Sequence, residues 1–599
     1  MLISIPIILP PADLLSVGGF VDSEMDPRPL KKEKEKMKKC IRITTWLLLI
    51  AMLAGLCTSC NLTSDNEGSE ETTVKRVEID MKNPTENNGE EIVYTGEIKY
   101  APEEYNVWDS WVVEKDGTFY LIHLKGLKGD KVYDTNKENQ RGYGVATSGD
   151  LLHWEEQDEI LNAGNSKSEY VVDFHYTGSA IVHEGRCYVF FTMRKWGGQR
   201  IGVAWSDDMV TWTEYTGNPV LEPDPQWFIG FNPTNYGQST SSVWTDKIDC
   251  RDFLVIKDPD GEGFIGYFVA SAEGIYQNSP VAVIGIARSN DLLNWTQSGI
   301  VYTPTGVSMP EMVDVFKIGN KWYMTLTTGK DNGGIDMFSD PYISRAQMYA
   351  VADSPEGPFV EDPTDNVVIG GQYSSGYSSR TIEVDGKRYM MYVDNGTLSL
   401  PKEVRVNEKG QLRVYYAEDK IKTLHTGTLT TNIMGQPTTS FGWQTHGGKW
   451  TGSGNAFTCT TDKNSWQAMA FDSTSKNLEL SFTLDASSDV TQFGVVLSNA
   501  VEFKNLDSLK NLLVLDRAHD RVYLTSYNWE LKNCRSYDFE MGCEYQIRVL
   551  LVQNTLELYI NGEMVFNSIF TNAGRNHAGL FANNGTMKVS NLELFKIES

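Results

Sequence analysis

The sequence predicts an all-β protein in which a five-bladed β-propeller, residues 96–415, precedes an antiparallel β-sandwich, residues 435–599. Two kinds of recurring segment and a later change in strand pattern predict this arrangement. The first kind is a strand of small and apolar residues, a turn through Ser and Asp, and a closing aromatic residue. It occurs as GVATSGDLLHW (144–154), GVAWSDDMVTW (202–212) and GIARSNDLLNW (285–295), and more weakly as YAVADSPEGPF (349–359).

The second kind of segment is a glycine-containing turn followed by an aromatic-rich strand, and five copies predict five blades. Short strands that repeat roughly every sixty to seventy residues, with Gly and Asp turns, are typical of propellers. An array of β-sandwiches is the alternative, but sandwiches do not repeat a Ser-Asp turn and a tryptophan at this spacing. The copies are EKDGTFYLIH (114–123), VHEGRCYVFF (182–191), DGEGFIGYFV (260–269), IGNKWYMTL (318–326) and EVDGKRYMMY (383–392).

The strand pattern changes after residue 442. The tryptophan-containing repeat stops, and long alternating strands appear, such as YQIRVLLVQNTLELYINGEMVF (545–566). Alternation of this kind predicts antiparallel strands that bury one face, as in a β-sandwich. A mildly polar linker, residues 416–434, is predicted between the two parts.

The N-terminal region has the layout of a bacterial lipoprotein leader. A basic start at Met37 is followed by a short apolar run and then by the sequence CTSC, which ends at Cys60. This order predicts a signal peptide over residues 37–59, lipidation of Cys60, and a flexible acidic tether over residues 60–95. Residues 1–36 are interpreted as an overlong start. We expect the protein to lie outside the cytoplasm, on a membrane and at the cell surface; an uncleaved N-terminal anchor is the alternative.

The composition limits the partners that the protein is expected to bind. The net charge of −26 argues against nucleic acid, because its phosphates require Lys and Arg. The aromatic content suits a neutral sugar ligand, although aromatic residues are more often part of a core. Five cysteines follow the lipidation site, an odd number without a CxxC pair, so neither a disulfide framework nor a zinc site is expected. A Cys534–Cys543 bridge stays open, and we expect no cofactor or metal.

Three acids occupy the same place relative to the recurrent strands of their blades. Asp109 lies in WDSW before the first such strand, Asp252 lies before the third, and Glu311 lies before the fourth. Because the innermost strands of a propeller converge on a central channel, we expect these acids to meet at one rim of that channel. Taken singly, Asp109 and Glu311 could be turn residues, and Asp252 could pair with Arg251.

Three carboxylates in one pocket suit the hydrolysis of glycosides with retention of configuration. One carboxylate attacks the anomeric carbon, and a second acid, with a raised pKa, protonates the leaving oxygen. These two groups lie about 5 Å apart in retaining enzymes. A third acid can bind sugar hydroxyls and stabilise positive charge in the transition state.

Several motifs resemble those of two related glycosidase families. VWDSW (107–111) resembles the nucleophile motif of levansucrases, glycoside hydrolase family 68, and YTGSAIV (176–182) resembles a segment of families 68 and 32. RDFLVIKDPDG (251–261) resembles the Arg-Asp-Pro motif of both, and PEMVDVFKIGNKWYM (310–324) resembles the Glu-Cys-Pro-Asp motif of invertases. The C-terminal segment is similar to the sandwich of family 32, which family 68 lacks. The resemblance covers residues 100–599 and favours family 32, the invertases, levanases and inulinases.

The resemblance implies a role for each candidate residue. Asp109 would be the nucleophile, Asp252 the transition-state stabiliser and Glu311 the acid/base. Four further residues would bind substrate: Arg251 through fructose hydroxyls, Ser179 by a hydrogen bond near the nucleophile, and Trp108 and Trp111 as walls of the pocket. Phe253 and Met312 depart from the motifs, which have proline and cysteine at these positions.

The sequence therefore predicts a retaining hydrolase that cleaves β-fructofuranosyl linkages in a fructan, such as levan or inulin, or in sucrose. A fructosyltransferase of levansucrase type, a non-catalytic glycan-binding lipoprotein and a hydrolase of another furanoside such as arabinan are the alternatives. The expected partners are an oligo- or polysaccharide and, through the lipid anchor, a membrane. The linkage, exo or endo action and the oligomeric state stay open.

Overall fold

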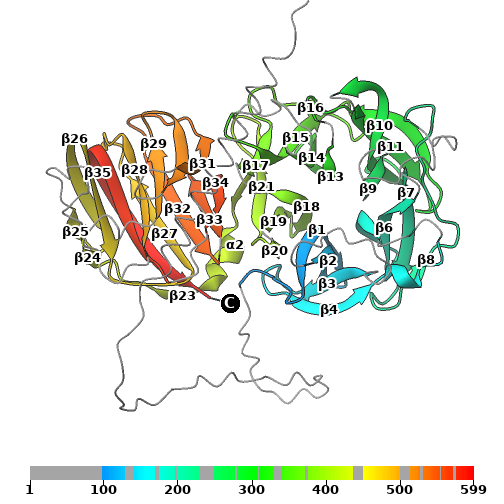
Figure 1. The fold of residues 1–599 in the computed structure, drawn as a ribbon, viewed down its shortest axis with the longest axis horizontal. Helices are drawn as coiled ribbons and strands as arrows, with labels where there is room; N and C mark the ends of the chain where they lie inside the picture. The colour runs from blue at the N-terminus through cyan, green and yellow to red at the C-terminus, as the bar shows by residue number, and fades with distance from the viewer. Residues whose placement is uncertain are drawn as a thin grey trace, which may run out of the picture. The chain divides into compact units, whose positions relative to one another are not determined.

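The computed structural model describes residues 98–598 with internal gaps, and nearly all of its regular structure is β-strand (Figure 1). The predicted leader, Cys60 and the tether lie outside the described residues. Within the described ranges, no helix is long and apolar enough to cross a membrane. The gaps are 128–140, 169–170, 172–174, 196–197, 230–248, 277–278, 308, 330–339, 372–375, 395, 436–449, 499–510, 526–530, 554 and 571–574.

Four separate antiparallel sheets come first along the chain. The first contains β1 (Tyr105–Lys115), β2 (Thr118–Leu127), β3 (Tyr143–Ser148) and β4 (Glu155–Ile160), and a short 3-10 helix, η2 (Ala163–Asn165), follows it. The second contains β5 (Tyr176–His183), β6 (Arg186–Lys195), β7 (Gly198–Ser206) and β8 (Thr213–Glu214). The third contains β9 (Cys250–Lys257), β10 (Phe264–Tyr276), β11 (Ser279–Ser289) and β12 (Thr296–Tyr302). The fourth contains β13 (Glu311–Ile318), β14 (Lys321–Gly329), β15 (Arg345–Ala352), β16 (Val360–Glu361) and β17 (Val367–Gly371).

The next strands form a group that is joined to the C-terminal part of the chain. They are β18 (Tyr377–Val384), β19 (Lys387–Asp394), β20 (Thr397–Leu398), β21 (Lys402–Val406) and β22 (Leu412–Tyr416). Strand β22 also pairs with β34 (Glu563–Ile569) through Tyr415 and Glu563, so β18–β22 belong to one connected sheet of 18 strands. The five separate blades predicted from the sequence are therefore four separate sheets and one joined group.

The first strands of the successive groups lie side by side in a ring. Strand β1 contacts β5, β5 contacts β9, β9 contacts β13, β13 contacts β18, and β18 contacts β1. Figure 1 shows β1, β9, β13 and β18 toward the middle of this propeller-like arrangement. Side chains at one end of these inner strands can therefore come together from distant parts of the sequence.

The recurring Ser-Asp-Trp segments form the turns between the third and fourth strands of the first three sheets. In the first sheet, the Ser148 hydroxyl accepts the Leu151 N–H at 2.9 Å, and Asp150 Oδ1 accepts the Leu152 N–H at 2.8 Å. The Trp154 indole N–H then donates to the Leu151 carbonyl at 3.2 Å. Ser and Asp suit such turns because their short side chains accept bonds from nearby backbone N–H groups. All three bonds recur around Ser289, Asp291 and Trp295. Around Ser206, Asp208 and Trp212 the aspartate and tryptophan bonds recur, and the Ser206 hydroxyl donates to Asp208 at 3.0 Å.

The C-terminal strands form a sandwich-like part with an apolar core. It follows α2 (Glu418–Ile421) and the 3-10 helix η5 (Lys422–Leu424). The long last strand β35 pairs with β28 near Leu580 and with β27 near Leu594, so it joins the two layers into one hydrogen-bonded sheet. The remaining strands are β23 (His425–Thr428), β24 (Ile433–Gly435), β25 (Thr451–Ser453), β26 (Ala456–Phe471), β27 (Leu478–Leu484), β28 (Gln492–Ser498), β29 (Asn511–Asp516), β30 (Arg521–Thr525), β31 (Leu531–Ser536), β32 (Tyr545–Val552), β33 (Thr555–Ile560), β34 and β35 (His577–Ile597).

The described cysteines are all free, so the Cys534–Cys543 bridge that the sequence left open is not formed. Cys534 is buried on β31, whereas Cys543 is partly exposed. Burial raises the pKa of the Cys534 thiol to about 11. The cysteine thus behaves as a small apolar side chain.

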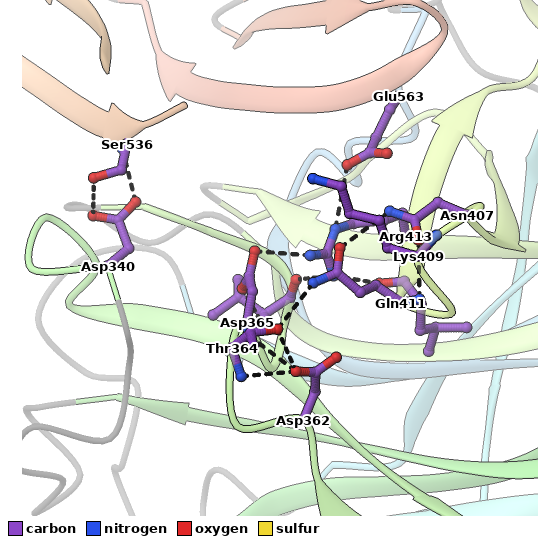
Figure 2. Close-up of polar contacts among 12 residues, drawn as sticks. Asp340, Asp362, Thr364, Asp365, Asn407, Lys409, Gln411, Arg413, Ser536 and Glu563 are labelled. Carbon is purple, nitrogen blue, oxygen red and sulfur yellow. Dashed lines mark hydrogen bonds and ion pairs between the residues drawn. The ribbon is translucent and has the colours of Figure 1, made fainter. Parts of the chain in front are cut away.

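Polar contacts connect the joined group to the sandwich-like part. Figure 2 shows Arg413 of β22 between Asp365 and Glu563, with N–O distances of 2.8 and 3.2 Å. In the same view, Asp340 accepts the backbone N–H of Ser536 at 2.8 Å. The Arg413 side chain is 5% exposed, whereas both of its partners are partly exposed, so solvent weakens these pairs.

The most deeply buried ion pair of this interface joins Lys402 of β21 to Glu557 of β33. Their N–O distance is 2.6 Å, and the side chains are 1% and 6% exposed. The Glu557 carboxylate also accepts the hydroxyls of Tyr392 and Tyr559 at 3.1 and 2.7 Å. Burial lowers the pKa of Lys402, and the Glu557 charge opposes this effect. The two charges are therefore stable only together.

Replacing Lys402 by Met should destabilise the protein by about 3 kcal/mol, because Glu557 is left as an uncompensated buried charge. The double variant Lys402→Met/Glu557→Gln should recover most of this loss. Denaturant unfolding measures both. Lys321→Met, which breaks an exposed pair with Asp353 (44% and 86% exposed), is the matched control and should change the free energy of unfolding by less than about 0.5 kcal/mol. A Lys402→Met protein as stable as wild type would contradict this account.

Candidate active site

The inner strands all carry a break in register near their first residues. The pairing of β1 with β2 shifts between Trp108 and Ser110, and the pairing of β5 with β6 shifts between Tyr176 and Gly178. Shifts at the matching places in β9, β13 and β18 complete the series. A β-bulge bends the strand and re-aims its side chains. The residues at or beside these five bulges are Asp109, Thr177, Asp252, Glu311 with Met312, and Ser378.

Asp109 is buried and accepts hydrogen bonds from two other inner strands. The Ser378 hydroxyl donates to its Oδ1 at 2.5 Å, and the Thr177 hydroxyl donates to its Oδ2. Burial raises the pKa of Asp109 above its ordinary value, while the two hydroxyls oppose this by stabilising the charged form. Asp109 is therefore held in place by donors that favour its carboxylate.

Asp252 lies within the electrostatic influence of Asp109 and is fixed through its backbone and its side chain. Its Oδ2 accepts the Met312 N–H at 2.8 Å, and its own N–H donates to the Thr192 hydroxyl at 3.1 Å. Burial raises the pKa of Asp252 to about 6; the nearby Arg251 opposes the shift and the Asp109 charge adds to it. The Asp252 backbone has φ = +57°, a conformation that non-glycine residues adopt rarely.

Glu311 completes the group of acids at the start of β13. The Tyr377 hydroxyl donates to its Oε2 at 3.0 Å and accepts the Trp108 indole N–H at 3.5 Å. Burial and the charge of Asp109 raise the pKa of Glu311 to about 7. Glu311 can therefore take up and release a proton near neutral pH.

Two arginines, Arg380 buried and Arg251 mostly buried, lie among the acids and are anchored by the protein. Arg251 binds Asp249 at 2.7 Å and donates to the Pro310 carbonyl at 2.9 Å. Arg380 donates to the carbonyls of Gly178 and Asp252, the latter at 2.9 Å. Because both guanidinium groups are anchored, they act on the acids as fixed positive charges.

Two of the predicted substrate-binding residues do not have the expected contacts. Trp111 is 4% exposed and packs edge-to-face on Tyr143, with ring centroids 5.4 Å apart, so it belongs to the core between the first two sheets. The Ser179 hydroxyl is buried and has no hydrogen-bond partner within the described part of the chain. Thr177, two residues earlier, makes the contact to Asp109 that we expected from Ser179.

The other predicted residues lie near the acids. Trp108 is partly buried and bonded to Tyr377, and Arg251 lies with its Nε 3.8 Å from Asp252. Thr177, Tyr377, Ser378 and Arg380 were not predicted from the sequence, because only the acids were compared by their place before the recurrent strands. In the described ranges, no group of three or more His, Cys, Asp or Glu side chains could hold a metal ion.

Two family models match the chain, one in each half. The model for the N-terminal domain of glycosyl hydrolases family 32 matches residues 131–234, and the model for the family 32 C-terminal domain matches residues 449–596. The chain therefore carries matches to both domain models of glycoside hydrolase family 32, which confirms its resemblance to that family. It is thus a glycoside hydrolase of the β-fructofuranosidase type.

Solved structures of family 32 share the fold of this chain. The β-fructofuranosidase of Bombyx mori is 17% identical, with a TM-score of 0.56 over 84% of this chain and 93% of that one. The exo-inulinase of Aspergillus awamori is 16% identical, with a TM-score of 0.57 over 84% and 98%. The sucrose-6-phosphate hydrolase of Lactobacillus gasseri is 15% identical, with a TM-score of 0.59 over 84% and 93%. No curated protein sequence matches the chain.

Proposed function

We propose that this protein hydrolyses β-fructofuranosyl linkages by double displacement, with retention of configuration. The observation that carries the proposal is the unequal environment of Asp109 and Glu311. Burial raises the pKa of both acids, but Asp109 accepts two hydroxyl hydrogen bonds, which favour its charged form, whereas the Asp109 charge adds to the rise of the Glu311 pKa, to about 7. A pair of carboxyl groups with separated pKa values is what a nucleophile and a general acid require.

In the first step, the Asp109 carboxylate attacks the anomeric carbon of the fructosyl group, and the glycosidic bond breaks as Glu311 protonates the leaving oxygen. In the second step, the ionised Glu311 removes a proton from water, and the water oxygen displaces Asp109 from the anomeric carbon. The products are free fructose and the shortened glycoside, and both acids return to their first protonation states. Asp252 would accept hydrogen bonds from sugar hydroxyls, which strengthen as charge develops on the ring.

The substrate is proposed to be a fructan or sucrose. Structures of related proteins contain sucrose, in a variant of the Bombyx mori enzyme, and fructosylnystose, in a variant of the Schwanniomyces occidentalis enzyme.

Incubation of the purified protein with sucrose, inulin and levan tests the proposal, with the released sugars identified by chromatography. Free fructose from at least one substrate supports hydrolysis, and elongated products would favour a fructosyltransferase. Binding without any turnover would favour a glycan-binding protein.

We also propose that β18–β22 act as the fifth blade of a propeller over residues 96–415, with the sandwich over residues 435–599. The ring of contacts among β1, β5, β9, β13 and β18 supports this division, as does the bulge that β18 shares with the other inner strands. The pairing of β22 with β34 would then be a link between two domains.

The N-terminal sequence supports a proposal about location. We propose that the mature chain begins at Cys60, carries lipid there, and is anchored on the outer side of a bacterial membrane.

Asp109→Asn should lower kcat by roughly a thousand-fold or more with an unchanged fold, because the attacking charge is lost.

Glu311→Gln should impair sucrose turnover strongly, but should affect fructosides with an acidic leaving group much less. Since Glu311 acts in its protonated form, kcat/KM should fall as the pH rises through about 7. Steady-state kinetics measure all three effects. Asp116→Asn, an exposed acid after the same strand, is the matched control and should behave as wild type.

Mass spectrometry of the protein from bacterial membranes should find a diacylglyceryl-modified Cys60 at the N-terminus. The lipid chains should keep the protein on the membrane, since each buried CH₂ adds about 0.8 kcal/mol of membrane affinity. Cys60→Ser should abolish the modification, and Cys57→Ser should leave it intact. A cytosolic protein with residues 37–59 still attached would refute the proposal.

A further inference from the structure

Ser378 contacts Asp109 from a backbone conformation that residues with side chains adopt rarely. It has φ = +53° in the bulge of β18, and the residue is fully buried. Its hydroxyl donates to Oδ1 of Asp109 at 2.5 Å. An unusual backbone conformation persists only where the surrounding structure enforces it, and such residues cluster at active sites.

Two side chains of the fourth sheet hold this bulge from both sides. The Ser378 N–H donates to the Thr327 hydroxyl at 3.1 Å, and that hydroxyl donates to Gln347 Oε1 at 2.6 Å. The Gln347 side-chain amide then donates to the Ser379 carbonyl at 3.3 Å. Thr327 on β14 and Gln347 on β15 are both fully buried. Their bonds therefore fix β18 at the place where the Ser378 hydroxyl meets Asp109.

We propose that Ser378 is a positioning residue that keeps Asp109 ionised for attack and so leaves the proton of the Asp109–Glu311 pair on Glu311. This inference rests on the proposed function and names the group that assigns the two roles. A hydroxyl donor stabilises a carboxylate more than a protonated carboxyl group. Since two buried acids that interact share their protons, a donor to one of them determines which acid is charged.

The other groups that act on Asp109 do not replace this donor. The charges of Asp252 and Glu311 oppose ionisation of Asp109, and Arg380 favours it from an anchored position. The phenols of Tyr143 and Tyr377 are neutral, because burial and the Asp109 charge raise their pKa values well above the ordinary value. Thr177 supplies the second hydroxyl, to the other carboxylate oxygen.

Ser378→Gly tests the proposal, because glycine adopts φ = +53° without strain and removes the hydroxymethyl group that carries the donor. The matched control is Ser379→Ala. It removes the adjacent buried hydroxyl, which has no hydrogen-bond partner in the described ranges, and leaves the carbonyl that Gln347 binds. Both variants are compared with wild type by NMR titration of ¹³C-labelled carboxyl groups, with Asp109→Asn to assign the Asp109 signal, and by pH profiles of kcat/KM.

In Ser378→Gly, the pKa of Asp109 should rise by about one unit, the effect of one hydrogen bond to a charged group. The acidic limb of kcat/KM should move to higher pH by the same amount, a roughly ten-fold loss on that side, while thermal unfolding stays within a few degrees of wild type. Ser379→Ala should match wild type in both measurements. An unchanged Asp109 titration in Ser378→Gly, or an equal shift in Ser379→Ala, would overturn the proposal.

The titration separates this inference from the proposed function. If the protein does not cleave fructosides, the wild type shows no turnover and gives no pH profile. The Asp109 titrations of the two serine variants can still be compared with that of the wild type. A shifted titration without turnover would retain the role of Ser378 in the ionisation of Asp109 and reject its role in catalysis. An Asp109 titration in Ser378→Gly that equals the wild-type titration, in a protein with normal turnover, would reject the role of Ser378 and leave the proposed function intact.

Discussion

The roles of Asp109 and Glu311 depend on which of these two carboxyl groups holds a proton near neutral pH. Asp109 accepts the hydroxyls of Thr177 and Ser378, which favour its charged form. That charge, together with burial, raises the pKa of Glu311 to about 7. Asp252 adds a third acid whose pKa is also raised, so the site concentrates negative charge that the anchored Arg251 and Arg380 offset. The carboxyl groups are chemically alike, and their different surroundings thus define their roles.

The bulges of the inner strands make these surroundings from distant parts of the chain. A regular strand alternates its side chains between two faces, whereas a bulge turns one residue out of this alternation. Because β1, β5, β9, β13 and β18 all break register near their first residues, each presents a polar side chain or a backbone N–H to the same place. The bonds between bulges, such as Met312 N–H to Asp252, then fix neighbouring strands to one another.

The acids could be found from the sequence because each precedes a recurrent turn and strand. The same argument could have found Thr177 and Ser378, which stand eight residues before the glycine of their turns, as Asp109 does. The packing of Trp111 in the core has no local signal, because the bulge at Asp109 changes which face the following residues occupy. The joining of β22 to the sandwich-like part depends on tertiary pairing and has no local signal. The aligned pairs are Asp109–Gly117, Thr177–Gly185 and Ser378–Gly386.

The most direct test of the account is to trap the covalent intermediate. Turnover of a fructoside with an acidic leaving group is quenched by acid, and the digested protein is analysed by peptide mass spectrometry. The account predicts one fructosyl group on the carboxyl group of Asp109, because that carboxylate is the one kept ionised and free of the shared proton. A fructosyl group on Glu311 or Asp252, or active turnover with inverted configuration and no adduct, would contradict it.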